Sequence, residues 1–162
     1  MSHIIVAGAL ANKMNHGGEA WVRLSWLKGF AKLGYNVHFV EQIAARQCHN
    51  GSENSAEMSA DVSIPFANSL PAKYFQKTMA DAGFGERSTL ICSDTGESIG
   101  LPINDLADLI SQSDLLVNIS GHLAIPQLFN AARRKAYVDI DPGFTQFWYA
   151  DNIGSNLERH DS

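Results

Sequence analysis

The chain has 162 residues, of which 45% are apolar and 18% charged, a composition typical of a soluble globular protein with one domain. Twelve Lys and Arg oppose seventeen Asp and Glu, and the net charge of −5 argues against a nucleic-acid partner. The longest apolar run, residues 4–11, is far shorter than the roughly 18 residues that a membrane span requires. It also lacks a basic leader, so we expect a cytoplasmic protein with no membrane span.

Short apolar runs alternate with longer amphipathic stretches along the chain. Residues 3–8 are apolar on both faces, which is typical of a strand buried inside a parallel sheet. The pattern predicts a helix at 19–33 and a second strand at 36–41. Further helices are expected at 74–82, 105–111 and 126–134, and further strands at 88–92, 114–119 and 136–139. This alternation predicts a three-layer αβα, Rossmann-like fold with a mostly parallel, doubly wound sheet of about five or more strands.

Three local features add to this expectation of a single domain over residues 1–162. Segment 46–63 is rich in Ser, Asn, Glu and Gly and has little periodicity, which predicts a mobile surface loop. The helix at 126–134 is expected to end in a basic run at 133–135, since positive charge is favourable at a helix C-terminus. Trp21 and Trp26 lie in the first helix and are expected in the core.

Polar and glycine residues follow the expected strands at their carboxyl ends, where this type of sheet binds ligands. They are the candidate binding residues: Gly17, Gly18, Glu41, Ser120, Gly121, Asp139, Gly143, Thr145 and Gln146. Gly17 and Gly18 open a helix whose free N–H groups could face a phosphate. Alternatively, the two glycines only let the loop turn into the helix.

His16, His122 and Asp141 are the candidate catalytic residues. An imidazole titrates near neutral pH, so either histidine could serve as a general base, or be a solvated or structural residue. Asp139 and Asp141 lie two apart at a strand end, so their carboxylates could share a proton, hold a cation or receive substrate hydroxyls. The alternative is a turn with an aspartate capping the next helix. No pair has the spacing of a local zinc motif, so we expect no metal.

An aromatic cluster follows the two aspartates. Its members could line a sugar site or form a hydrophobic docking face, and they are Phe144, Phe147, Trp148 and Tyr149.

Two stretches of the chain resemble the amino-terminal half of a GT-B glycosyltransferase. The first is Gly17-Gly18-x-x-Trp21, followed by a Leu-Gly-Tyr-Asn-Val run at 33–37 in which Tyr35 stands where those enzymes usually carry histidine. The second comprises 114–121 and 137–146, and its most specific piece is the Asp-Pro-Gly-Phe-Thr-Gln block at 141–146. Together they span nearly the whole chain and resemble bacterial proteins described as glycosyltransferase-like.

The resemblance implies two Rossmann-like domains with the active site between them. The amino-terminal domain would hold the acceptor, and the other would hold most of the nucleotide-sugar donor. This chain would then be the acceptor-side domain, truncated after its first Rossmann-like domain and inactive without a C-terminal donor-binding domain or chain. The resemblance assigns acceptor-side roles to Gly17, Gly18, His122 and Asp141, with His16 or His122 as the base.

The same resemblance sets the expected ligands and partners. No cofactor is expected, and a nucleotide sugar would be a donor substrate only when the second domain is supplied. The expected partners are that domain or chain, a sugar or other small-molecule acceptor, and a second copy of the chain.

Two other functions stay open. The chain could be a stand-alone small-molecule-binding module, or an interaction module that self-associates through residues 144–149. It could also be a small, complete hydrolase or epimerase that uses His122 and Asp141.

Overall fold

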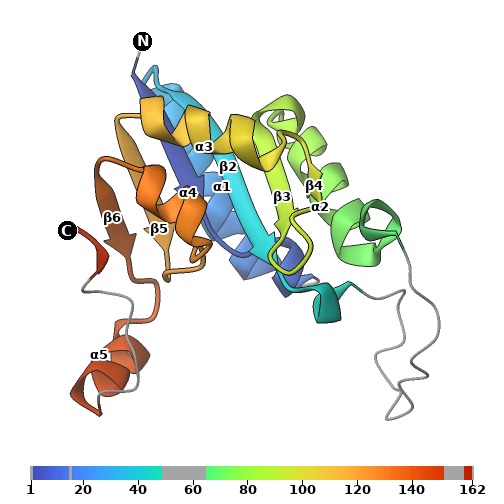
Figure 1. Ribbon diagram of the computed structural model, residues 1–162. Coiled ribbons are helices and arrows are strands. Elements are labelled where there is room, and N and C mark those ends of the chain that lie inside the picture. The colour runs from blue at the N-terminus through green and yellow to red at the C-terminus, as the bar shows by residue number, and fades with distance from the viewer. Residues whose placement is uncertain (1, 15, 49–64, 152–158, 162) are drawn as a thin grey trace.

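A six-stranded sheet lies between two layers of helices (Figure 1) in the computed structural model, which describes residues 2–14, 16–48, 65–151 and 159–161. The strands are β1 (His3–Ala7), β2 (Asn36–Ile43), β3 (Ser88–Cys92), β4 (Ser98–Ile99), β5 (Leu115–Ile119) and β6 (Lys135–Val138). Their spatial order is β4-β3-β2-β1-β5-β6, and only the pairing of β4 with β3 is antiparallel. The expected Rossmann-like α/β fold is therefore confirmed.

Helices cover both faces of the sheet (Figure 1). One layer contains α1 (Gly17–Lys32) and α2 (Leu70–Asp81), and the other contains α3 (Ile103–Gln112) and α4 (Pro126–Ala131). The short 3-10 helices are η1 (Ala11–Lys13), η2 (Ala45–Gln47), η3 (Phe66–Asn68) and η4 (Gly85–Arg87). A further helix, α5 (Pro142–Ala150), lies apart from these layers, below β6 in Figure 1.

The core has two halves, one on each side of the sheet. In β1, Ile4 and Val6 pack with α1 and α2, whereas Ile5 and Ala7 pack with α3 and α4. Successive side chains of a strand point to opposite faces, so a strand covered on both sides must be apolar throughout. This is why residues 3–8 lack a polar face.

The order of the strands places a topological switch point between β1 and β5. The chain proceeds from β1 toward β2 and β3 on one side, and returns to place β5 and β6 on the other. In open α/β sheets, ligands bind in the crevice outside the carboxyl ends of the strands at such a point. The residues that follow β1 and β5 therefore define where to look for a site.

The expected basic end of the fourth helix is wrong. α4 stops at Ala131, and Ala132 is already extended, with φ −69° and ψ 130°. Arg133 and Arg134 lie outside the helix, and Lys135 is the first residue of β6, paired with Leu116 of β5. Pairing in the sheet thus overrides the electrostatic preference for a longer helix.

The expected burial of the two tryptophans is also wrong, since Trp21 is 66% and Trp26 36% exposed. α1 carries apolar residues on every side, whereas Leu27 is its only fully buried apolar residue. One face of a helix can contact the sheet, and the remaining apolar residues of α1 are left at the surface.

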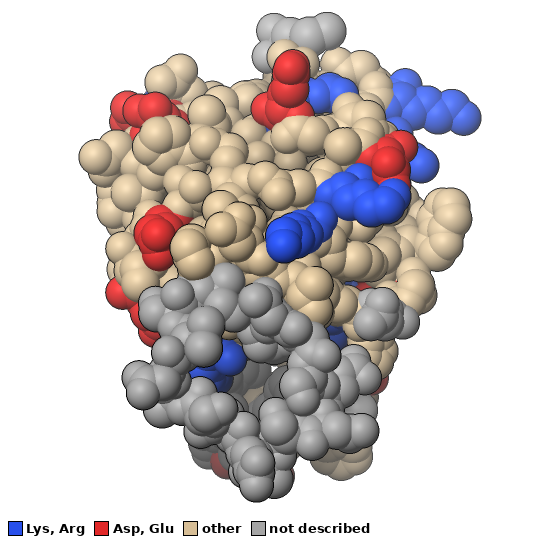
Figure 2. Space-filling view, turned by 90° about the vertical axis from the view of Figure 1, so that its right-hand side faces the viewer, with Lys and Arg blue, Asp and Glu red and all other residues tan. Residues whose placement is uncertain are grey.

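The surface carries charges of both signs. In Figure 2, Lys and Arg are interspersed with Asp and Glu among uncharged residues on the described part of the face that lies at the right of Figure 1. Within the described residues no helix combines the length and apolar character needed to cross a membrane. Of the expected loop at 46–63, residues 49–63 lie outside the described part of the chain.

Candidate functional site

The loops after β1 and β5 meet at the switch point. His16 occupies the N-cap position of α1, and Gly17 is the first residue of the helix. Ser120 and Gly121 follow β5 with φ values of 54° and 67°, and Ser120 is the one non-glycine residue with positive φ among the described residues. A serine held in this sparsely populated region is a conformational cost that the surrounding structure must offset, and such residues cluster at functional sites.

A pocket of about 580 Å³ opens beside the start of α1. Its lining comprises His16, Gly17, Gly18, Glu19, Val22 and Ile140. Ile140 lies between Asp139 and Asp141, so the pocket is bounded by the start of α1 on one side and the segment after β6 on the other. The structure thus brings three sequence-predicted residues, His16, Gly17 and Gly18, into one cavity.

Arg23, which the sequence analysis missed, is almost fully buried beside this pocket at 1% exposure. Its Nη1 donates to the backbone oxygen of Glu19 at 3.1 Å and to the Glu19 carboxylate. The two residues are four apart on α1, so they share one face of the helix. The available sequence signal was an arginine inside the apolar stripe between Ala20 and Leu27, preceded by a glutamate one turn earlier.

His122 follows the strained Ser120–Gly121 pair. Burial, together with the positive charges of Arg23 and Lys13, lowers the pKa of His122 to about 4, against the opposing effect of Glu19. These electrostatic partners place His122 near the start of α1. Its imidazole is uncharged at neutral pH, which makes it a weak base but leaves one nitrogen to donate and one to accept a hydrogen bond.

Glu41 lies beneath the loop that joins β1 to α1. One carboxylate oxygen accepts from the Ala11 N–H at 2.7 Å and the other from the Asn12 N–H at 2.9 Å. Burial raises the pKa of Glu41 to about 7, although these backbone hydrogen bonds and Arg23 act in the opposite direction. The structure therefore gives Glu41 a supporting position, because both of its oxygens already hold the loop.

Two further polar residues, also missed in the sequence, hold the loop after β5. Gln42 Oε1 accepts from the backbone N–H groups of Ala124 at 2.8 Å and Ile125 at 3.0 Å. The fully buried amide of Asn118 accepts from the Leu123 N–H at 3.0 Å and donates to the Leu123 carbonyl at 3.1 Å. The sequence signal available for Gln42 and Asn118 was a polar residue near the end of an otherwise apolar strand.

The remaining candidates follow β6. Asp139 accepts a hydrogen bond from the Asp141 N–H at 3.0 Å, and Asp141 occupies the N-cap position of α5 without a side-chain cap bond. Gly143 and Gln146 are exposed on α5, and Thr145 is buried at 6%. The described lining of the pocket includes no residue of α5. The structure therefore separates these three residues from the pocket, whereas the two aspartates flank Ile140 at its wall.

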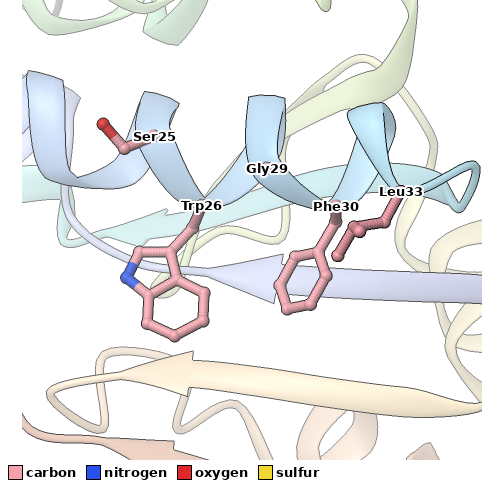
Figure 3. Close-up of a pocket in the computed structure, with 5 residues that line it drawn as sticks. All are labelled: Ser25, Trp26, Gly29, Phe30 and Leu33. Atoms are coloured by element: carbon pink, nitrogen blue, oxygen red, sulfur yellow. The ribbon is translucent and has the colours of Figure 1, made fainter.

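A second, apolar groove of about 270 Å³ runs along α1 (Figure 3). It is lined by Ser25, Trp26, Gly29, Phe30 and Leu33. Trp26, Phe30 and Leu33 project from one flank of the helix, and the Trp26 and Phe30 ring centroids lie 5.7 Å apart. This lining has no ionisable side chain, so the groove suits apolar contact rather than chemistry.

Among the described residues, no group of three or more His, Cys, Asp and Glu side chains is arranged to hold a metal ion. The chemistry available at the switch point is therefore that of imidazoles, carboxylates, a buried guanidinium and a helix N-terminus. No protein-family model matches the chain, and no curated protein matches it in sequence.

Proposed function

We propose that the chain is the acceptor-side half of a GT-B glycosyltransferase-like protein and is inactive without a donor-binding C-terminal domain or chain. The observation that carries this proposal is the pocket at the carboxyl edge of the sheet, with His16 and the start of α1 on one wall and Ile140 on the other. This is the part of a Rossmann-like fold that binds small molecules. A pocket of this size and mixed lining suits a sugar or another polyhydroxylated acceptor.

His16 is the better placed of the two candidate bases, because it is exposed and lines the pocket. In the proposed reaction it removes the proton of an acceptor hydroxyl as that oxygen bonds to the anomeric carbon of the donor sugar. The bond from that carbon to the leaving phosphate oxygen breaks, and the nucleoside diphosphate departs. His122, with a pKa of about 4, would contribute a hydrogen bond rather than basicity.

Asp141 completes the proposed acceptor site from the opposite wall. Its carboxylate is exposed and makes no cap bond to α5, so it can accept hydrogen bonds from acceptor hydroxyls. Removing it would weaken acceptor binding without changing the base.

The donor part of the proposal is tested on the chain alone. We expect UDP- and dTDP-sugars to bind weakly or not at all in a calorimetric titration. Binding in the micromolar range would contradict the assignment of the chain as an acceptor-side half.

The catalytic part is tested by reading the source DNA past the codon for Ser162 and assaying the encoded product for transfer of a radiolabelled sugar. A second domain of alternating strands and helices is expected. His16→Ala should then lower kcat by a factor of about 10² or more, whereas His122→Gln should keep most of the activity. Unrelated sequence after Ser162, or an unaffected His16→Ala variant, would count against the proposal.

Self-association is the second candidate function, and it is favoured by the position of the exposed apolar residues. Four of the large ones lie on α1 or just after it, and these are Trp21, Trp26, Leu33 and Tyr35. Phe147 and Tyr149, within the segment 144–149 that is expected to self-associate, are exposed as well. Exposed apolar residues gathered in this way favour an interaction site. Sedimentation equilibrium at increasing concentration should show a dimer, and a strict monomer would exclude this function.

A further inference from the structure

The guanidinium of Arg23 is incompletely satisfied although it is almost fully buried. Nη1 is bonded to Glu19, but Nε has no hydrogen-bond partner among the described residues, and it is the one buried side-chain N or O atom there in this condition. A buried N–H without an acceptor is costly, because water no longer solvates it. The described residues thus supply an acceptor to Nη1 but none to Nε.

The side chain of Arg23 lies across the carboxyl ends of β1 and β5. A Cβ built on Gly8, the residue after β1, would lie 3.2 Å from Arg23 Cγ, 3.5 Å from its Nε and 3.5 Å from the Cβ of Ile119, the last residue of β5. Arg23 can occupy this position because Gly8 has no side chain. The unpartnered N–H is therefore at the switch point itself, where ligands of this fold bind.

Two basic side chains, Lys13 and Arg23, lie within electrostatic range of His122, together with the Glu19 carboxylate. Glu41 is a second carboxyl in the range of Arg23, and both of its oxygens already accept backbone N–H groups. α1 begins here, and the first N–H groups of a helix carry partial positive charge and lack intrahelical acceptors. Apart from chain neighbours and the backbone of α1, no described atom lies within 4 Å of a Cβ built on Gly17 or Gly18, so a ligand can approach this backbone closely.

The Glu19 carboxylate is the internal anion that is hydrogen-bonded to Arg23. It lines the pocket, and its side chain is 32% exposed, against 2% for that of Arg23. An anion entering the pocket meets Glu19 first and reaches the guanidinium by replacing it. Rotation of Glu19 toward solvent breaks one ion pair and allows another to form.

We infer that the switch point binds a phosphate group, which displaces Glu19 from Arg23 and receives the N–H groups at the start of α1. Phosphate matches the planar fork of arginine and the N-terminus of a helix together. This inference deepens the proposed function, because it gives the acceptor a phosphate group. The acceptor would be a phosphorylated sugar or another phosphate ester, and this identity rests on the proposed function. The binding site itself stands on the geometry of Arg23, Glu19 and α1.

The test measures phosphate binding to the full chain by calorimetry or by amide chemical shifts. The probes are inorganic phosphate, glucose 6-phosphate, UDP and acetate, each titrated into wild type, E19Q, R23K and E86Q. E19Q removes the internal competitor and should bind inorganic phosphate about fivefold more tightly than wild type. E86Q removes the same charge from an exposed position on η4 and should bind like wild type. R23K keeps the charge but loses the fork and should bind several times more weakly.

The outcome for E19Q decides the inference even where an Arg23 variant folds poorly, because Glu19 is partly exposed and circular dichroism can confirm its fold. Equal affinities of E19Q and E86Q, or no phosphate binding to either, would overturn the proposed site. Acetate binding as tightly as phosphate would overturn the choice of phosphate. Tighter binding of glucose 6-phosphate than of UDP supports a phosphorylated acceptor as the ligand. Tighter binding of UDP would overturn this assignment of the phosphate to an acceptor. A protein that binds phosphate as expected but shows no glycosyl transfer would refute the proposed function alone.

Discussion

Two regions at the same edge of the sheet are built in opposite ways. The loops after β1 and β5 are held by side chains of the strands beneath them, and these are the buried Glu41 and Asn118 and the half-buried Gln42. The segment after β6 leads into α5, where Phe147 is 72% and Tyr149 55% exposed. The first region is held in place by these hydrogen bonds, and the second presents exposed apolar side chains.

The cause of this difference is the position of each strand in the sheet. Consecutive side chains of β2 point to opposite faces, so Glu41 reaches the loop after β1 on the α1 side and Gln42 reaches the loop after β5 on the α4 side. A central strand can thus support loops on both faces. β6 is the edge strand, and no described strand lies beyond it.

The largest expected effect comes from removing the support under the loop after β5. Asn118→Ala leaves the N–H and carbonyl of Leu123 without their partners, and Leu123 is 2% exposed. We expect the free energy of unfolding to fall by about 4 kcal/mol, measured by urea denaturation. Asn130→Ala, at an exposed position of α4, is the matched control and should change it by less than about 0.5 kcal/mol. Similar losses for both variants would remove the distinction between the two regions.

Glu41→Gln tests the support under the loop after β1 through the pH dependence of the free energy of unfolding. The folded-state pKa of Glu41 is raised from 4.5 to about 7, so between these values the folded protein holds a proton that the unfolded chain has released. This contribution to stability is complete below pH 4.5 and is lost as the pH rises through about 7. Relative to wild type, E41Q should therefore gain up to about 3 kcal/mol across this window.

Any change in hydrogen bonding caused by the new amide is independent of pH and offsets the E41Q curve without changing its slope. Glu86→Gln, on the exposed η4, should follow the wild-type profile. Parallel curves for E41Q and wild type would show that Glu41 does not titrate in this range.

Gln42→Ala tests the support from the opposite face of β2. The N–H groups of Ala124 and Ile125 lose their shared acceptor. Both residues are only half-buried, so water can supply part of the lost hydrogen bonding. We expect a loss of about 1–2 kcal/mol in urea denaturation. Gln42→Glu keeps an oxygen acceptor and should restore most of the lost stability. If it does not, the loss in Gln42→Ala does not come from the missing acceptor.

The smallest effect is expected on α5. Phe147→Ala and Tyr149→Ala shorten exposed side chains and should each change the free energy of unfolding by less than about 0.5 kcal/mol. If α5 serves as a docking element, the same two variants should weaken self-association in sedimentation equilibrium. A large loss of monomer stability would show instead that α5 belongs to the folded core.

Sequence patterns predicted the layers of the fold because burial determines them locally. A strand covered on both faces must be apolar, and the third strand was placed correctly at 88–92 from such a run. The position of the α4 end was not predictable in this way, because it depends on pairing between Lys135 and Leu116. The exposure of Trp21 and Trp26 likewise depends on how much of α1 the sheet can cover.

The site was predictable only in part. Loop position identified His16, Gly17 and Gly18, since the carboxyl ends of parallel strands share one edge. The roles of Gln42 and Arg23 required coordinates, because one bonds to residues more than 80 positions away and the other depends on the missing side chain of Gly8. No local pattern encodes either contact.

The two edges of the sheet are closed in different ways. β4 has two residues and folds back antiparallel onto β3, so it offers too short a backbone to template another strand. β6 is parallel to its neighbour β5. At its outer side the Lys135 N–H donates to the Asp161 carboxylate, and the Lys135 carbonyl accepts from the Asp161 N–H. The sheet therefore ends at one side in a strand too short for further pairing, and at the other in a strand whose first residue is already paired with Asp161.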